Sequence, residues 1–407
     1  MEFEALRYAL DALDEPALCQ GFVRLDRPLA LQLPGGEPIS AYGPALVEWL
    51  VPRSEPAPFG QGHETKLDPS VRCALRLTTR GNGRVIGLDL STIIAEIEER
   101  LSPRTHLAAT LTDVITYPVG GHFALHKDTP RSPALIGTLI VGLPVAHEGG
   151  AFRIENEVGP NVIDWSGPVD PLLLRWAALF TDVDHAVDSV TEGARVTLVY
   201  SLTQTEHVRD DQTQEQRLGA LLEVARYLEA PDNGPLMIAC TRQVIVQDGA
   251  PQPQGVATLR GTDRDVADVL TSCGFSVAVR TCVAARYRDG DVEPTPIHIP
   301  CLRGEGGAFF ARLRRPLSDR EVKELLEAVV FGPHAGGDGG GFMDDEASSL
   351  APFIVDEVPL ENWVFRTRAL ATFLREVHFS DYNFVGNDAC EAFLYQLAAL
   401  EVFAGKR

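Results

Sequence analysis

A short run, His126-Lys127-Asp128, is the first place in this sequence where side chains could bind a metal. It is the only His-x-Asp triplet around the ten histidines of the chain. On a β-strand, residues i and i+2 point to the same face, so a strand here would project His126 and Asp128 together. Imidazole and carboxylate ligands suit Fe, Zn or Mn, and one further ligand would complete a site.

His185 is the candidate for that further ligand, because it follows the strand-like run Leu172 to Phe180. Two histidines and one carboxylate form the facial triad of non-haem Fe(II) oxygenases, which leaves three coordination positions open. Arg195 comes next, inside the strand-like run ARVTLVY. A guanidinium binds a carboxylate through two parallel hydrogen bonds, more specifically than lysine does. The ligand implied by these residues is a small diacid.

The segment Tyr117 to Asp128, YPVGGHFALHKD, resembles a known family signature. The signature is Tyr-x-x-Gly-x-x-aromatic-x-x-His-x-Asp, found in prolyl-4-hydroxylase-like 2-oxoglutarate/Fe(II) dioxygenases. The resemblance continues through Gly149-Gly150-Ala-Phe152 and ALF before His185, and it covers roughly Leu111 to Leu202. Order, spacing and strand context all agree with the family pattern.

The resemblance implies a double-stranded β-helix, of the jelly-roll or cupin-like type, that binds Fe(II), 2-oxoglutarate and O2. It implies metal and catalytic roles for His126, Asp128 and His185. It implies that Arg195, Tyr117 and Thr197 contact the cosubstrate. The expected reaction is hydroxylation of an unactivated C–H bond, with succinate and CO2 as coproducts and ascorbate as a supporting reductant. A protein or peptide residue, prolyl by analogy, is the expected substrate.

Two residues refine this expectation. Halogenases of the superfamily carry Gly or Ala in place of the carboxylate ligand, so Asp128 favours hydroxylation. Gly142 stands where relatives often carry a tyrosine that helps hold 2-oxoglutarate, and a glycine leaves room there. We expect His122 and His147 to have structural or solvent roles, and Trp165 to line either a pocket or the core.

The elements that must position these residues are short apolar runs separated by Gly and Pro between Ala108 and Leu202. Such runs, without long helices between them, predict a barrel or sandwich. We therefore expect an α+β, mainly β protein in three regions. Residues 1–107 form an N-terminal helical and extended support region, residues 108–205 the double-stranded β-helix core, and residues 206–407 a mixed α/β domain.

Outside the core, the spacing of apolar residues predicts helices over Leu88–Leu101, Leu218–Leu228, Ser318–Val330 and Thr367–His378. The polar stretch Thr203–Arg217 predicts a linker, and Ala335–Gly341 a loop.

Charge, apolar runs and cysteine spacing indicate which partners and which cellular compartment to expect. The chain has 407 residues, 36 Lys plus Arg against 57 Asp plus Glu, and a net charge of −21, which disfavours nucleic acid. Its N-terminus lacks a signal-peptide pattern, and no apolar run is long enough to span a membrane. Seven scattered cysteines without a Cys-x-x-Cys pair argue against a disulfide framework and a zinc knuckle. We expect a cytoplasmic protein, of an oligomeric state that the sequence does not specify.

Two alternatives to a peptide hydroxylase stay open. The first is a small-molecule or natural-product hydroxylase of the same superfamily, which an enclosed pocket would favour over a long groove. The second is a non-catalytic sensing or binding protein that keeps the fold, for which iron would be irrelevant.

Overall fold

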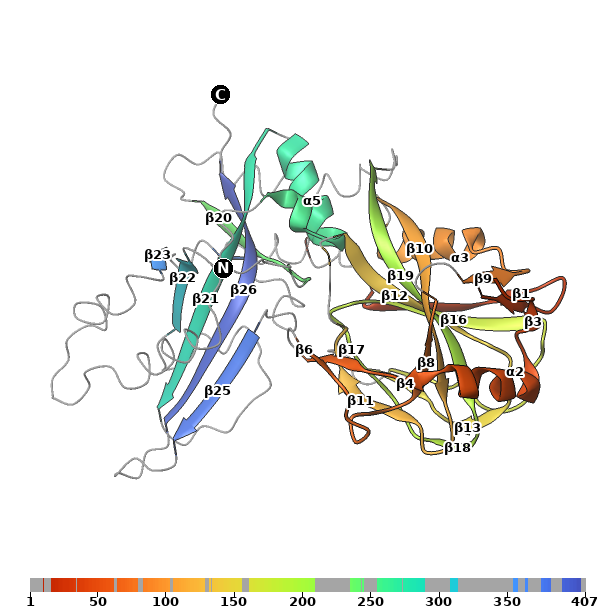
Figure 1. The fold of residues 1–407 in the computed structure, drawn as a ribbon. Helices are drawn as coiled ribbons and strands as arrows, with labels where there is room; N and C mark the ends of the chain where they lie inside the picture. The colour runs from red at the N-terminus through yellow and green to blue at the C-terminus, as the bar shows by residue number, and fades with distance from the viewer. Residues whose placement is uncertain are drawn as a thin grey trace. The chain divides into compact units, whose positions relative to one another are not determined.

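The computed structural model describes part of the chain, which divides into two compact units, Glu15–Asp211 and Met1–Asp14 with Gln212–Arg407 (Figure 1). The described residues are 10, 16–33, 35–61, 64–79, 83–102, 105–128, 132, 134–155, 161–208, 235–242, 244, 255–272, 274–289, 308–313, 354–357, 363–364, 375–381 and 390–403. The fold is mainly β, as expected, and the strand pairings among the described residues are antiparallel apart from β20 with β24.

The larger sheet of the unit Glu15–Asp211 has seven strands in the order β1-β16-β12-β19-β10-β8-β4. Their bounds are Leu18–Arg24, Leu173–Phe180, Leu135–Gly142, Arg195–Val208, Thr105–Tyr117, Leu75–Thr78 and Glu55–Pro56. Strands distant in sequence thus become neighbours, and β19 lies between β12 and β10. Along β10, burial alternates in the first half and becomes continuous over the last residues, which end at Tyr117.

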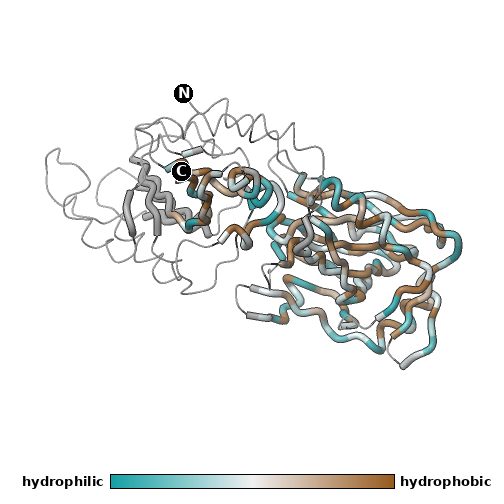
Figure 2. Tube along the Cα trace, turned by 90° about the horizontal axis from the view of Figure 1, so that it is seen from above, coloured by the Kyte–Doolittle hydropathy of each residue, from teal (hydrophilic) through white to brown (hydrophobic). Residues whose placement is uncertain are grey.

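A second sheet of the same unit has the order β15-β14-β17-β11-β7. Its strands are Asn161–Ile163, Phe152–Glu155, Asp184–Val187, His122–His126 and Arg72–Cys73. The main hydrophobic core takes its buried residues from both sheets, for example Leu139 and Trp176 from the larger and Phe152 and Ile154 from the smaller. Figure 2 shows hydrophobic and hydrophilic residues alternating along the chain trace of this unit.

Smaller elements complete this unit. They are the hairpin β5 (Phe59–Gln61) with β6 (Glu64–Lys66), the pair β13 (His147–Gly149) with β18 (Val190–Gly193), the sheet β3 (Ile39–Ser40), β2 (Ala30–Gln32) and β9 (Arg84–Ile86), and the helices α2 (Gly43–Leu50), η1 (Val51–Arg53) and α3 (Ser91–Leu101).

The helix predicted over Leu88–Leu101 is confirmed as α3. It buries an apolar stripe of Ile93, Ile97 and Leu101. Ser91 is the first helical residue, and Leu90 before it offers no side-chain cap. The backbone N–H of Ser91 instead donates to Asp89 Oδ1 at 2.9 Å, which satisfies one of the unpaired donors at the helix start.

The other unit contains a sheet with the order β23-β22-β21-β26-β20-β24, with β25 paired to β26. The bounds are Ile354–Glu357, Ala308–Leu313, Ser276–Asp289, Cys390–Phe403, Leu236–Ala239, Trp363–Val364 and, for β25, Arg375–Asp381. Helix α5 (Gly261–Ser272) and the turn η2 (Val256–Thr258) belong to it. A separate core that includes Leu236, Leu270 and Leu400 shows that this unit has its own hydrophobic interior.

The predicted linker Thr203–Arg217 is partly wrong. Residues up to Val208 continue β19, and Val208 pairs with Thr105 of β10. The polar composition reflects the half-exposed side chains of Thr203 and Gln204 on this strand, rather than a break in structure.

The helix predicted over Thr367–His378 is also wrong where the structure describes it. Residues from Arg375 onward form β25, which pairs along its length with β26. Strand pairing here overrides the local helical pattern. The helices predicted over Leu218–Leu228 and Ser318–Val330, and the loop Ala335–Gly341, lie outside the described residues.

Within the described residues, no helix combines the length and apolar character that crossing a membrane requires. None of the described cysteines Cys19, Cys73, Cys240 and Cys282 is in a disulfide bond. Burial raises the pKa of Cys19 to about 12, so its thiol stays protonated.

Candidate metal and carboxylate site

His126, Asp128 and His185 meet in the second sheet although they are far apart in sequence. His126 ends β11 and lies directly opposite His185 of β17, with ring centroids 4.1 Å apart. Asp128 follows two residues after the end of β11, so it is placed by the segment after the strand rather than by the strand itself. One potential ligand atom from each residue lies within 4.8 Å of the others. His185 Nε2 is 3.9 Å from Asp128 Oδ1.

Backbone contacts set the tautomer of both imidazoles. His126 Nδ1 lies 2.9 Å from the carbonyl of Ala124, and His185 Nδ1 lies 2.8 Å from the carbonyl of Val183. A carbonyl only accepts hydrogen bonds, so each Nδ1 carries the proton and donates it. Each Nε2 is left with a lone pair, which is the form of histidine that binds a metal.

Asp128 is oriented by a neighbouring hydroxyl. The Oγ1 of Thr138 on β12 donates to Asp128 Oδ2 at 2.6 Å. That bond occupies one carboxylate oxygen and leaves Oδ1, the oxygen nearer His185, for a metal. Thr138 belongs to the larger sheet, so the two sheets together fix this ligand.

Apolar packing keeps the imidazole of His126 neutral. Its ring stacks on Phe123 with centroids 3.5 Å apart, and Phe152 packs 5.5 Å from the His185 ring. Burial, assisted by the charge of nearby His185, lowers the pKa of His126 to about 3. A neutral imidazole is what metal coordination requires.

This group fits a divalent transition metal. Two imidazoles, one carboxylate and oriented outer contacts form the donor set of non-haem Fe(II) sites. Among the described residues, it is the one cluster of three or more such side chains that could hold a metal.

The cluster opens on a cavity of about 280 Å³ between the two sheets. The larger sheet contributes side chains at every second position of three strands, as the two-residue period of a strand requires. These are Asp113, Ile115 and Tyr117 of β10, Thr138 and Ile140 of β12, and Arg195, Thr197, Val199 and Ser201 of β19. The smaller sheet contributes Arg72, Phe123, His126, Phe152, His185 and Val187.

Arg195 is a buried cation that has no carboxylate partner in the described part of the chain. It is 2% exposed, and no described residue places a carboxylate within ion-pair distance of it. Its Nη2 is buried without a hydrogen-bond partner. The guanidinium carbon lies 5.6 Å from the Tyr117 ring and 5.3 Å from the Trp165 ring. Burial lowers the pKa of Arg195, yet a guanidinium stays charged in proteins, so the site is electrostatically incomplete.

Tyr117 and Thr197 lie where the sequence pattern places them, on the walls of the same cavity as Arg195. Tyr117 is directly opposite Arg195 in the β10–β19 register. Thr197 is two residues beyond Arg195 on β19 and 2% exposed. Both residues therefore line the cavity together with the guanidinium of Arg195.

The room predicted at Gly142 is filled by Trp165. A methyl group added at Gly142 would lie 2.7 Å from Trp165 Cε3, so the indole occupies the space that a larger residue would take. Trp165 also packs on the guanidinium of Arg195. Trp165 thus lines a second cavity and also packs against the hydrophobic core, so both expected roles stay open.

His147 is a residue of this site that the sequence did not indicate. Its Nδ1 contacts the Val145 carbonyl at 3.0 Å, and its buried Nε2 has no partner. His147, Trp165 and Arg195 line a second cavity of about 80 Å³. Burial lowers the pKa of His147, the Val145 carbonyl opposes this, and the charge of Arg195 adds to it. His122, in contrast, contacts the carbonyls of Gly120 and Ser70 and is structural.

Comparisons with known proteins give weak likenesses. No family model and no curated protein matches the chain. A 2OG-Fe(II) oxygenase-family oxidoreductase from Burkholderia pseudomallei is 19% identical, with 39% of this chain and 78% of that one covered and a TM-score of 0.25. A Pseudomonas putida prolyl-4-hydroxylase is 15% identical, with coverages of 49% and 99% and a TM-score of 0.29.

A third solved structure is a Trichoplax adhaerens prolyl hydroxylase in complex with a hypoxia inducible factor peptide fragment. It is 15% identical, with 53% of this chain and 93% of that one covered and a TM-score of 0.33. At these TM-scores the likenesses carry no weight for the chemistry of this chain.

Proposed function

We propose that this protein is a 2-oxoglutarate- and Fe(II)-dependent dioxygenase that hydroxylates an unactivated C–H bond. The observation that carries the proposal is the buried, unpaired guanidinium of Arg195 in the same cavity as the His126, Asp128 and His185 cluster. A metal-ligand set alone fits many enzymes. A buried cation that requires an anion beside it points to a carboxylate-bearing cosubstrate that also reaches the metal.

The proposal assigns each residue a physical task. His126, Asp128 and His185 hold Fe(II), which when bound supplies the activation of O2 and the oxidising power for the reaction. Thr138 keeps the Asp128 carboxylate in its ligating orientation. Phe123, Phe152, Ile140 and Val187 line the cavity and limit the access of water.

The cosubstrate is held by the larger sheet. Arg195 binds the distal carboxylate of 2-oxoglutarate, and the hydroxyls of Tyr117 and Thr197 donate to it. This arrangement needs no proton transfer, because the guanidinium already carries its charge. Packing by Trp165 holds the guanidinium plane in place before the cosubstrate arrives, so little conformational entropy is lost on binding.

We further propose that the unit with these residues is a double-stranded β-helix, with the chemistry in residues 108–205 and with support from the region before it. By family resemblance, the substrate is a protein or peptide residue of the prolyl type. Succinate and CO2 are the coproducts.

The test measures 2-oxoglutarate binding and succinate formation by the full-length protein. We expect the Fe(II)-loaded protein to bind 2-oxoglutarate under anaerobic conditions with a new metal-to-ligand absorption band. With O2 and ascorbate it should form succinate slowly even without substrate. His126→Ala should remove both signals, whereas His122→Ala, a histidine of the same strand that contacts only backbone carbonyls, should keep them. Absence of the band and of succinate in the unaltered protein would contradict the proposal.

A further inference from the structure

Besides Arg195, three cationic side chains line the cavity, and they come from both sheets and from the segment after β11. Arg72 lies on β7, Arg76 on β8 and Lys127 just after β11, and all three line the cavity. Their presence is notable in a chain with a net charge of −21. Which of these charges is already neutralised decides what ligand the cavity can still accept.

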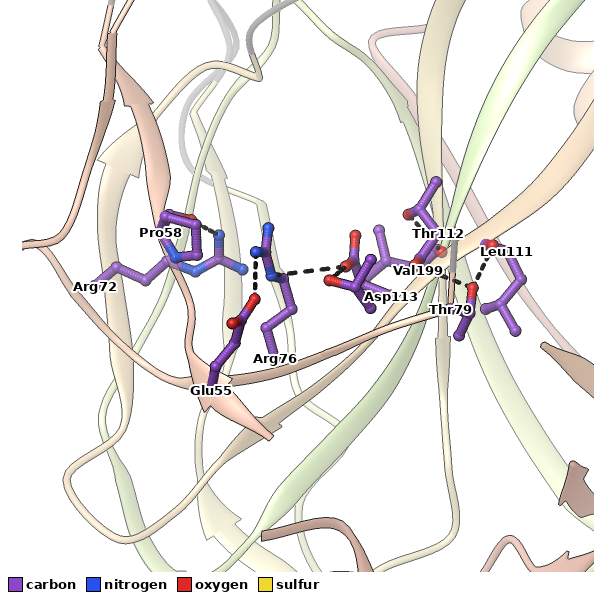
Figure 3. A network of polar contacts seen from close by, with 10 residues as sticks. Glu55, Pro58, Arg72, Arg76, Thr79, Leu111, Thr112, Asp113 and Val199 are labelled. Carbon is purple, nitrogen blue, oxygen red and sulfur yellow. Dashed lines mark hydrogen bonds and ion pairs between the residues drawn. The ribbon is translucent and has the colours of Figure 1, made fainter. Parts of the chain in front are cut away.

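Arg76 and Lys127 have carboxylate partners. Arg76 Nη2 lies 2.7 Å from Glu55 Oε1, and its Nε lies 3.8 Å from Asp113 Oδ1 (Figure 3). Lys127 Nζ lies 3.4 Å from Asp184 Oδ2. A β-bulge near Thr112 in the β10–β19 pairing precedes Asp113, and Asp113 lines the cavity. These two cations are therefore balanced by the protein itself.

Arg72 has no carboxylate partner among the described residues. Its Nη1 donates to the Pro58 carbonyl at 2.7 Å, and its guanidinium carbon lies 4.4 Å from the centre of the Phe123 ring (Figure 3 shows the first contact). Its Nε is buried without a hydrogen-bond partner. The contacts with Pro58 and Phe123 fix the side chain but leave its charge uncompensated.

The position of Arg72 relates it to the metal cluster. Arg72 pairs with Phe123 across β7 and β11, and the Phe123 ring stacks on His126. The guanidinium thus lies one aromatic ring away from a metal ligand. Arg72 and Arg195 belong to different sheets, so one cavity holds two unpaired guanidinium groups on separate walls.

The charges of the loaded site suggest different ligands for the guanidinium groups of Arg195 and Arg72. In the loaded site, the charges of Fe(II) and Arg195 together equal those of Asp128 and the dianionic 2-oxoglutarate. Arg72 is then the cation on the cavity wall that has no direct carboxylate partner among the described residues, whereas Arg76 and Lys127 have theirs. We propose that the substrate carries a carboxylate that binds Arg72, either the side chain of an acidic peptide or the carboxylate of a small acid. This inference rests on the proposed function.

The test measures the preference of the cavity for an acid over its neutral amide. The full-length protein is loaded with Mn(II) and 2-oxoglutarate, and dissociation constants are measured by calorimetry for two matched pairs. The peptide pair is Ac-Ala-Glu-Ala-NH2 and Ac-Ala-Gln-Ala-NH2, and the small-acid pair is N-acetyl-L-alanine and N-acetyl-L-alaninamide. We expect one acid to bind roughly 10- to 100-fold more tightly than its amide, as a hydrogen-bonded charge pair does. The pair that shows the preference identifies the source of the carboxylate.

Two substitutions assign the preference to Arg72. Arg72→Gln should reduce the acid-to-amide ratio to about one, and Arg72→Lys should keep part of it because the charge remains. Arg53→Gln is the matched control. Arg53 also donates to a backbone carbonyl, that of Trp49 at 3.0 Å, and lies 4.6 Å from an aromatic ring centre, but it does not line the cavity. It should keep the full ratio.

Three results would overturn the inference. They are an acid-to-amide ratio of one for both pairs in the unaltered protein, a ratio that survives in Arg72→Gln, and a loss of 2-oxoglutarate affinity in Arg72→Gln as large as the loss for the acid. The affinity of the unaltered protein for 2-oxoglutarate is measured first. Its absence would contradict the proposed function, whereas normal affinity with no preference for acids would contradict the anion site alone.

Discussion

Replacing Arg195 by methionine should stabilise the ligand-free protein while it weakens cosubstrate binding. The guanidinium is 2% exposed and has no carboxylate partner among the described residues. Methionine keeps most of the aliphatic contacts with Tyr117 and Trp165 and removes the buried charge. Replacing buried charges by apolar groups of similar volume is often stabilising by about 1–4 kcal/mol. We expect about 2 kcal/mol, which raises the melting temperature by about 4–8 °C for a domain of this size.

The same substitution removes the anchor for the distal carboxylate. Losing one partner of a buried charged hydrogen bond costs about 2–5 kcal/mol, so Arg195→Met should weaken 2-oxoglutarate at least about 30-fold. A ligand present at 100 times its dissociation constant stabilises a protein by about 2.7 kcal/mol, and after a 30-fold loss of affinity that gain should fall to about 0.9 kcal/mol. Thermal unfolding with Mn(II), with and without 2-oxoglutarate, measures both effects. The two melting temperatures should differ without the ligand and converge with it.

The result that would refute this reasoning is a lower melting temperature of ligand-free Arg195→Met, because it would show that the protein itself satisfies the guanidinium. Equal ligand-induced shifts in both proteins would refute the role in binding. Arg153→Met is the control, since Arg153 forms an exposed pair with Asp188 at 2.8 Å. Such pairs contribute about 0–1 kcal/mol, so this variant should lose little stability and keep the full shift.

Three further predictions concern the metal ligands and the packing around the cation. Thr138→Val removes the hydrogen bond to Asp128 Oδ2 and should weaken metal affinity about 10- to 100-fold, measured by competition with a chelator; unchanged affinity would contradict the orienting role. The pKa of His126 lies near 3 in the folded protein and near 6.5 when unfolded, so the metal-free protein should lose stability as pH falls from 6.5 toward 3. In urea unfolding, the free energy of unfolding of His126→Gln should depend less on pH between 6.5 and 3 than that of the unaltered protein. The same pH dependence in both proteins would show that His126 is not responsible for the loss of stability. Gly142→Ala should displace Trp165, destabilise the protein by about 1–3 kcal/mol and weaken 2-oxoglutarate; Trp165→Leu in the same chain should restore the stability but not the affinity.

The sequence could predict the residues whose relation is local or follows strand periodicity. Tyr117 and His126 share one short segment, and Thr197 shares a strand face with Arg195, so their placement on one cavity follows from the pattern. The contact of Trp165 with Gly142 could not be predicted in this way. It depends on how the segment after β15 crosses the end of β12, which no period encodes.

Arg72 illustrates a second limit. It precedes His126 by more than fifty positions and lies outside the segment Leu111 to Leu202. Arg72 is of interest because no described carboxylate pairs with it. Ion pairs between distant residues depend on how the strands pair, which the sequence pattern does not show. The polar strand end after Thr203 shows the reverse error, because a hydrophilic composition was interpreted as a linker although β10 pairs with it.

The opposition of His126 and His185 on neighbouring strands has a consequence for folding. Because side chains alternate between faces, sliding β17 by one residue against β11 would turn one imidazole away from the other. A bound metal can bridge the two rings only when the strands are aligned correctly. A bound metal would therefore stabilise the correct register of β11 and β17 over shifted registers. Amide hydrogen exchange in these two strands should become slower when the metal binds.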